Sequence, residues 1–209
     1  MGRQNRSEIT IATLLDAVAE RLITTDESLI RIPEVCEATG VNYGSVYHHF
    51  RNRDAVIDAA YAKIFTQYVD QDIEMLRVAA ELPQDAGTFL EIIRGVIRLV
   101  SDSPSRHNSR QMRLRVVAVA QTRPQLYLQI SEAQARLTDK LAEVVAIAQE
   151  RGFVNIAISA KSIAVAIQSL LFGRALDKAS SSPLSDEAWV EMSDAMLIAL
   201  LLPAENRAA

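Results

Sequence analysis

Apolar residues recur at helical spacing along almost the whole chain, and this periodicity constrains the fold more than any other feature. Near the N-terminus, Leu14, Val18 and Leu22 follow one another at intervals of four residues, which places them on one face of a helix. No long run alternates polar and apolar residues as a half-buried strand would. The sequence therefore predicts an all-α fold.

Capping residues predict short helices before residue 53 and longer ones after it. A first helix is expected after Ser7, a second from about Pro33 to Thr39, and a third from Asn42 to about His49. Longer helices are expected from Arg53 into the 70s and over about 86–102, 104–121, 124–151, 159–178 and 186–202. We therefore expect an N-terminal three-helix domain at 1–53 and a larger helical domain at 54–209.

Composition limits the class of protein. The 209-residue chain has a formal net charge of -4, so any contact with nucleic acid must come from a local patch of positive charge. Its single cysteine, Cys36, excludes an internal disulfide and is typical of a reducing compartment. The sequence shows no apolar signal region, and its apolar stretches are too short or too polar to span a bilayer. We expect a cytoplasmic protein that does not bind a membrane.

The segment GVNYGSVYHHF, residues 40–50, gathers two tyrosines and two histidines on one short helix. At 100° per residue, Val46 and Phe50 point inward, and Gly44 and His48 lie on the opposite side. The outward surface is small and polar, and such a surface suits a groove. Short helices joined by a tight turn match the helix-turn-helix motif, whose second helix reads base edges in the DNA major groove.

Two motifs, LLDAVAERL at 14–22 and VCEATGVNYGSVYHHFRNRDAVI at 35–57, resemble the TetR family of bacterial transcriptional regulators. The resemblance covers about residues 7–57 by motif, and the rest of the chain by length and helical character. It implies a helix-turn-helix domain at 1–53 that binds a double-stranded DNA operator. It further implies that residues 54–209 bind a small-molecule effector and form a homodimer, and that the effector releases this repressor from DNA.

The resemblance assigns DNA contacts to the third helix and to its flanks. This family usually has Thr or Ser leading into the second helix, but here the sequence is LIRIPE, in which Arg31 is the only obvious substitute. The residues expected to contact bases or phosphates are Arg31, Tyr43, Gly44, Ser45, Tyr47, His48, His49 and Arg53.

Other chemistry near the third helix is disfavoured. His48 and His49 diverge by 100° on a helix, and no cysteine or third histidine nearby completes a metal site. His49 has packing at the helix end as an alternative role. The sequence lacks a phosphate-binding glycine loop and a nucleophile elbow, so we expect no enzyme and no cofactor. Cys36 is expected to be a buried apolar side chain, with a redox sensor as the alternative.

An arginine-rich segment lies between Pro104 and Pro124. It contains no acid, and its arginines are Arg106, Arg110, Arg113, Arg115 and Arg123. Such stripes usually form solvated or salt-bridged faces, here opposite acids such as Asp70, Asp72 and Glu74. A second interpretation is that Arg113 reaches into a cavity and pairs with an anionic effector.

Inward-facing positions of the longer helices are candidates for an effector pocket. The candidates are Ile92, Val96, Met112, Arg113, Val116, Tyr127, Gln168 and Phe172. An enclosed cavity of several hundred cubic ångströms would favour control by a small molecule. Without such a cavity, a DNA-binding regulator controlled by a protein partner is the alternative. An all-α carrier or enzyme that binds a small apolar molecule is a further one.

The last two helices carry apolar stripes that are too large for a monomer to leave in water. Pairing each helix with its twin would build a four-helix bundle with two-fold symmetry. The residues expected at this dimer interface are Ile163, Ile167, Leu170, Leu171, Met192, Met196 and Leu200.

Overall fold

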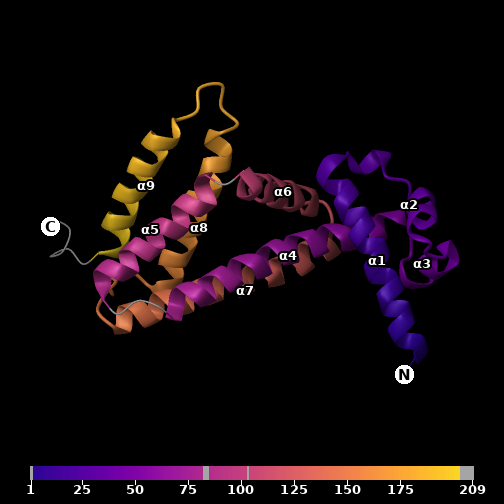
Figure 1. Ribbon diagram of the computed structural model, residues 1–209, viewed down its shortest axis with the longest axis horizontal. Helices are drawn as coiled ribbons and strands as arrows, with labels where there is room; N and C mark the ends of the chain where they lie inside the picture. Colours follow the sequence, from indigo (N-terminus) through magenta and orange to yellow (C-terminus); the bar gives the residue numbers. More distant parts are fainter. Residues whose placement is uncertain (1, 82–84, 103, 203–209) are drawn as a thin grey trace. The chain divides into compact units, whose positions relative to one another are not determined.

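The computed structural model describes residues 2–81, 85–102 and 104–202. Within these ranges the chain forms nine α-helices, one short 3-10 helix and no strand (Figure 1), which confirms the predicted all-α fold. In chain order the elements are α1 (Gly2–Thr24), η1 (Glu27–Leu29), α2 (Ile32–Thr39), α3 (Tyr43–His49), α4 (Arg53–Glu81), α5 (Ala86–Asp102), α6 (Pro104–Ala120), α7 (Pro124–Glu150), α8 (Ala160–Asp177) and α9 (Asp186–Leu201).

Local capping interactions set most helix ends where the sequence predicts them. Asn42, Asn52 and Ser185 precede α3, α4 and α9, and each side chain accepts a backbone N–H three residues on, at 3.2, 2.9 and 3.1 Å. Gly40 and Gly152 follow α2 and α7 with φ angles of 70° and 76°, a conformation that other residues rarely adopt. One boundary was predicted wrongly, because α1 begins at Gly2 rather than after Ser7.

The chain divides into two compact units. The first comprises residues 1–68 and 115–131, and the second comprises residues 69–114 and 132–209. The boundary therefore falls inside α4, α6 and α7. The first unit extends beyond residue 53, and the predicted division of function at that residue stays a prediction.

The core of the first unit is made by the apolar faces of its helices. Leu14, Val18 and Leu22 of α1 are fully buried, as their spacing predicts. The helix α2 packs against α1. Val46 is the buried residue of α3, and Val56 anchors the start of α4. A single inward position therefore holds α3 in place and leaves its other sides accessible.

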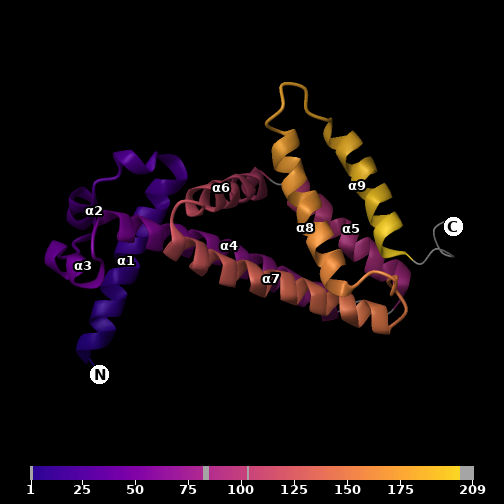
Figure 2. The same cartoon turned by 180° about the vertical axis from the view of Figure 1, so that it is seen from behind.

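In the second unit, α5, α8 and α9 pack against one another, and α8 and α9 form an antiparallel hairpin (Figures 1 and 2). Arg174 is fully buried near the end of α8 and lies 4.9 Å from the ring centroid of Trp189 in α9. It donates hydrogen bonds to Asp177 and Asp186. Arg174 thus ties α8 to α9 beside their connecting loop.

None of the helices in the described ranges combines the length and the apolar character needed to cross a membrane.

Candidate DNA-binding surface and effector cavity

The surface of α3 away from Val46 is polar and accessible. Tyr43 is 47% exposed although it is large, and Tyr47 is half-buried beside it. The exposed residues of the helix are Tyr43, Gly44, Ser45, His48 and His49. The orientation predicted from the helical wheel is therefore the one that the fold adopts.

Two ring pairs shape this surface. The centroids of Tyr43 and Tyr47 lie 4.7 Å apart, and a hydrogen bond with Tyr43 raises the pKa of the Tyr47 phenol. Tyr47 therefore keeps its proton at neutral pH. The rings of His48 and His49 meet edge to face with centroids 5.6 Å apart. The surface thus offers hydroxyl and imidazole groups, which suit base edges and phosphates.

No metal cluster accompanies the histidines in the part of the chain that the structure describes, where no three side chains of His, Cys, Asp or Glu come together as ligands.

Arg53, predicted to contact phosphate, is engaged within the chain. Its Nε donates to the carbonyl oxygen of Ile30 at 3.3 Å, and its Nη2 donates to the carbonyl oxygen of Glu27. A third nitrogen, Nη1, donates to the Asp54 carboxylate at 3.2 Å. Residues 27–30 form η1 and the approach to α2. Arg53 therefore holds the backbone of Glu27 and Ile30, and its predicted contact with phosphate stays a prediction.

Arg31 has a different environment. It is exposed and stands at the N-cap position of α2, where its side chain makes no capping hydrogen bond. Pro33 occupies the first turn of the helix. The backbone N–H groups of a helix N-terminus attract anions, so Arg31 lies where a phosphate would be held by both charge and backbone. Its role as a substitute for the usual Thr or Ser stays a prediction.

Cys36 is buried in α2. Burial raises the pKa of its thiol, which disfavours the reactive thiolate. The environment therefore supports the predicted packing role rather than the alternative of a redox sensor.

Arg123 belongs to an ion-pair network in the first unit. It donates to the carboxylates of Asp58 at 2.7 Å and Glu27 at 2.5 Å. Burial alone would lower the pKa of Arg123, but these two hydrogen bonds raise it. Glu27 uses its side chain for Arg123 and its backbone carbonyl for Arg53. Arg53 and Arg123, which are distant from Glu27 in the sequence, thus both hold Glu27 in place ahead of α2.

Arg115 also serves the first unit. It donates to the carbonyl oxygen of Leu22 at 3.1 Å, near the end of α1. Its guanidinium lies 5.9 Å from the ring centroid of Tyr61, and burial raises the pKa of Tyr61 to about 12. Arg115 therefore satisfies one of the carbonyl groups that a helix C-terminus leaves without an internal partner.

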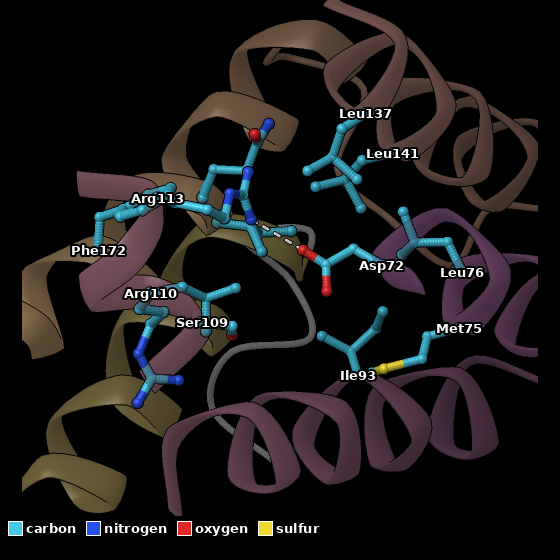
Figure 3. Close-up of a pocket in the computed structure, with 13 residues that line it drawn as sticks. Asp72, Met75, Leu76, Ile93, Ser109, Arg110, Arg113, Leu137, Leu141 and Phe172 are labelled. Carbon is cyan, nitrogen blue, oxygen red and sulfur yellow. Dashed lines mark hydrogen bonds and ion pairs between the residues drawn. The ribbon is translucent and has the colours of Figure 1, made fainter. Parts of the chain in front are cut away.

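A cavity lies within the second unit, among α4, α5, α6, α7 and α8 (Figure 3). Its volume is about 80 Å³, which is room for several water molecules and less than the several hundred cubic ångströms that would favour control by a small molecule. The residues that line it are Asp72, Met75, Leu76, Ile93, Ser109, Arg110, Arg113, Leu137, Leu141, Ile167, Gln168, Leu171 and Phe172. Most of this wall is apolar, with a few polar groups among the apolar side chains.

Arg113 is the centre of the polar part of the wall. It is only 6% exposed. It donates to the carboxylate of Asp72 at 2.9 Å (Figure 3) and to the amide oxygen of Gln134, also at 2.9 Å. Its guanidinium lies 5.0 Å from the ring centroid of Phe172. Gln134 in turn donates to Gln168. Both predicted interpretations of Arg113 therefore describe part of its environment, because it pairs with an acid and also lines a cavity.

Known proteins that resemble this chain include TetR-family regulators. Residues 30–60 match the family described as bacterial regulatory proteins, tetR family, and these residues include α2, α3 and the start of α4. Similar solved structures include a TetR-family transcriptional regulator from Mesorhizobium loti, with 18% identity over 93% of this chain and 96% of that one and a TM-score of 0.71. Residues 30–60 thus match the tetR family, and the fold is the one that TetR-family transcriptional regulators share. The resemblance inferred from the sequence is confirmed.

Two further structures illustrate the range of the fold. Escherichia coli NemR in its reduced form is 16% identical over 93% of this chain and all of that one, with a TM-score of 0.68. A transcriptional regulator from Saccharomonospora viridis in complex with choline is 13% identical over 94% of this chain and 99% of that one, with a TM-score of 0.68. No curated protein sequence matches the chain. The TetR-family regulators with this fold are transcription factors and not enzymes.

The TetR-like fold brings part of the predicted effector site together. The predicted residues that line the cavity are Arg113, Gln168 and Phe172. Those that do not line it are Ile92, Met112, Val116 and Tyr127. Of these, Val116 and Tyr127 belong to the first unit, and Ile93 rather than Ile92 faces the cavity. The side chain of Val96 lies outside the described residues.

Several lining residues were not predicted. They are Asp72, Met75, Leu76, Ile93, Ser109, Arg110, Leu137, Leu141, Ile167 and Leu171, of which the last two were predicted for the dimer interface instead. Asp72 had a usable signal, since it was one of the few acids expected opposite the arginine stripe. The apolar members had none, because their spacing also fits an ordinary helical core.

The predicted dimer stripe of α8 faces inward instead. Ile163, Ile167 and Leu170 are buried within the chain, and Ile167 and Leu171 line the cavity. These residues therefore have little surface to offer a partner. The reason is that α8 is apolar on several sides, so the sequence did not define which stripe points outward.

The accessible apolar surface of α8 and α9 lies elsewhere. Val165 and Leu176 of α8 are 49% and 71% exposed, and their spacing of eleven residues puts them on one face. In α9, Met196 is 52% exposed, while Met192 and Leu200 are half-buried. An interface between copies of the chain would therefore use Val165, Leu176 and Met196 rather than the inward stripe of α8.

Proposed function

We propose that the chain is a ligand-responsive transcriptional repressor that binds a palindromic DNA operator as a homodimer and is released by a small-molecule effector. The observation that carries the proposal is the accessible polar side of α3, a helix that is capped by Asn42 and anchored by Val46. Its accessible side presents Tyr43, Gly44, Ser45 and His48, where the second helix of a helix-turn-helix contacts base edges.

Phosphate contacts would come from the flanks of that surface. Arg31 at the start of α2 and Ser45 in α3 are exposed and polar. Arg53 would act indirectly, because its donors hold the backbone of Glu27 and Ile30. Binding should weaken with salt, since each neutralised phosphate contributes a slope of about -0.9 in log K against log salt.

The effector would bind in the cavity of the second unit, which has mainly apolar walls and a small set of placed polar groups. This composition is typical of small-molecule sites. The Saccharomonospora viridis regulator with a similar fold was solved with choline, which supports a small-molecule role for the fold. Since the cavity measures about 80 Å³, the effector is compact or moves wall side chains when it binds.

The modest volume of the cavity favours one second candidate, a DNA-binding regulator controlled by a partner protein. The two functions differ in what releases the protein from DNA. A purified dimer that a small molecule releases without any other protein supports the first function, whereas release only after addition of a cell extract's protein fraction supports the second.

Selection of duplexes from a random pool, followed by fluorescence anisotropy at near-physiological salt, tests DNA recognition. We expect a clear preference for the selected palindrome over random duplex. We also expect His48→Ala to lose discrimination worth about 1–3 kcal/mol at particular base pairs. The matched control is Arg136→Ala on α7, an exposed residue paired with Asp70. Equal affinity of the wild type for selected and random duplex would refute the proposal.

Sedimentation tests the homodimer. We expect a dimer mass at micromolar concentration, and monomers for Leu176→Glu and Met196→Glu, which change exposed positions. Ile163→Glu is the contrasting variant, because a charge at a fully buried position should unfold the second unit. A wild-type monomer bound to a single half-site would contradict both the dimer and the palindrome.

A further inference from the structure

We propose that the effector is a compact organic anion whose carboxylate replaces Asp72 as the partner of Arg113. This inference rests on the proposed function, since it names the chemical class that the cavity would bind. It concerns the ion pair between Arg113 and Asp72, two residues that line the cavity and that a dashed line joins in Figure 3.

The charges on the wall favour an anion. Arg113 lines the cavity, is 6% exposed and directs its guanidinium toward Asp72, the acidic residue among the lining side chains (Figure 3). An anion placed between low-dielectric apolar walls interacts with a guanidinium far more strongly than it does in water. Arginine also matches a carboxylate geometrically, because its parallel N–H groups can bind both oxygens.

The surroundings of Arg113 disfavour a cation. The guanidinium already donates to the Asp72 carboxylate at 2.9 Å, and its central carbon lies over the Phe172 ring, 5.0 Å from the ring centroid. These are the two groups in the cavity that would attract a positive ligand. A cationic effector would have to compete with a tethered arginine for both of them, whereas an anion would take the place of the Asp72 carboxylate beside Arg113.

Asp72 is the partner that can leave. Its side chain is 24% exposed, against 7% for the side chain of Arg113, so its carboxylate reaches water with a smaller rearrangement. A departing carboxylate would be rehydrated, and the incoming one would take its place beside Arg113. The pair therefore closes the cavity in the ligand-free protein and opens it for an anion.

The apolar side chains limit the rest of the ligand. Leu76, Ile93, Leu137 and Leu141 face the hollow beside Asp72 and Arg113 (Figure 3). For scale, a dry cavity of about 150 Å³ holds benzene, and this one holds about 80 Å³ before Asp72 moves. A single ring or a short alkyl chain attached to the carboxylate therefore enters only if wall side chains move together with Asp72, which enlarges the cavity.

Calorimetry with three probes of equal shape tests the charge preference. Benzoate, benzamide and benzamidinium share one ring and carry charges of about -1, 0 and +1 at neutral pH. We expect benzoate to bind about 10- to 100-fold more tightly than the other two, which is the usual value of a charged hydrogen bond. Butyrate and octanoate carry the same carboxylate on alkyl chains, and at least one of the three carboxylates should bind.

Two variants test whether the preference for an anion depends on the pair of Arg113 and Asp72. Asp72→Asn removes the internal competitor and should tighten carboxylate binding by about tenfold or more, while Arg113→Gln should abolish the preference for the anion. Arg136→Gln is the matched control, since this exposed arginine pairs with Asp70 on α4 and does not line the cavity. Because Asp72→Asn keeps the shape of the side chain, it remains informative even if Arg113→Gln folds poorly.

The proposal is overturned if benzamide or benzamidinium binds as tightly as benzoate, or if none of the carboxylates binds at about 10 mM. It is also overturned if Asp72→Asn weakens carboxylate binding. Operator titrations separate this failure from that of the proposed function. If a neutral or cationic compound releases the DNA, the proposed repressor function stands and the anion site is refuted. If a carboxylate binds as described but leaves operator affinity unchanged, the anion site stands and the proposed control by this effector is refuted.

Discussion

Arg113 and Arg123 come from one arginine-rich segment, yet they occupy different kinds of environment. Arg123 donates to two carboxylates, those of Asp58 and Glu27, in the first unit. Arg113 has one carboxylate among its hydrogen-bond partners described above and stands on a cavity wall in the second unit. The partners of each arginine therefore indicate its role. Arg123, with two carboxylates, is structural, whereas Arg113 is proposed to exchange its carboxylate partner Asp72 for a ligand.

The largest effect should follow from removing the structural arginine. In Arg123→Gln, the carboxylates of Asp58 and Glu27 lose their cation while they stay about three-quarters buried. We expect the free energy of unfolding to fall by about 2–3 kcal/mol, measured by urea denaturation. Arg136→Gln breaks an exposed pair and should cost about 0–0.5 kcal/mol. Equal losses in the two variants would remove the basis of the comparison.

A smaller and reversible effect is expected at the cavity. Arg113→Gln should lower the free energy of unfolding by about 1–2 kcal/mol, and Asp72→Asn in the same chain should restore at least half of it, because no unpaired charge remains. Glu27→Gln should fail to rescue Arg123→Gln, since Asp58 stays unpaired. A double-mutant cycle at each site measures this contrast. Rescue at both sites, or at neither, would show that the two arginines do not differ.

The DNA-binding surface offers a third comparison, between Arg53 and Arg31. Arg53→Ala frees the carbonyl oxygens of Glu27 and Ile30 and should destabilise the chain by about 1 kcal/mol. Arg31→Ala should leave stability within about 0.5 kcal/mol but reduce the salt slope of DNA binding by about 0.9. Urea denaturation and salt titrations measure the two effects. A stability loss for Arg31→Ala equal to that for Arg53→Ala would contradict the separation of roles.

Features that depend on neighbouring residues could be predicted from the sequence. The ends of α2, α3 and α4 follow from Gly40, Asn42 and Asn52, whose side chains or backbone act within three residues. The outward face of α3 follows equally locally, because Val46 is its one buried position. Periodicity and capping therefore sufficed for the helices and for the surface proposed to bind DNA.

Features that depend on distant residues could not be predicted. Arg53 finds its carbonyl acceptors 23 and 26 residues earlier in the chain, and no local pattern announces them. The same holds for Gln134, which lies 21 residues from Arg113, whereas Asp72 was among the acids expected opposite the arginine stripe and does pair with Arg113. In α8 the difficulty was the opposite, because apolar residues occur on both faces and only packing decides which of them faces inward.

The central claim is that occupation of the cavity at Arg113 controls DNA binding. Its most direct test is the affinity for the selected operator, measured by fluorescence anisotropy with and without saturating carboxylate. We predict that the carboxylate weakens operator binding by about tenfold in the wild type, that operator weakens carboxylate binding by the same factor, and that Arg113→Gln shows neither effect. An unchanged operator affinity while calorimetry shows the cavity filled would contradict the account.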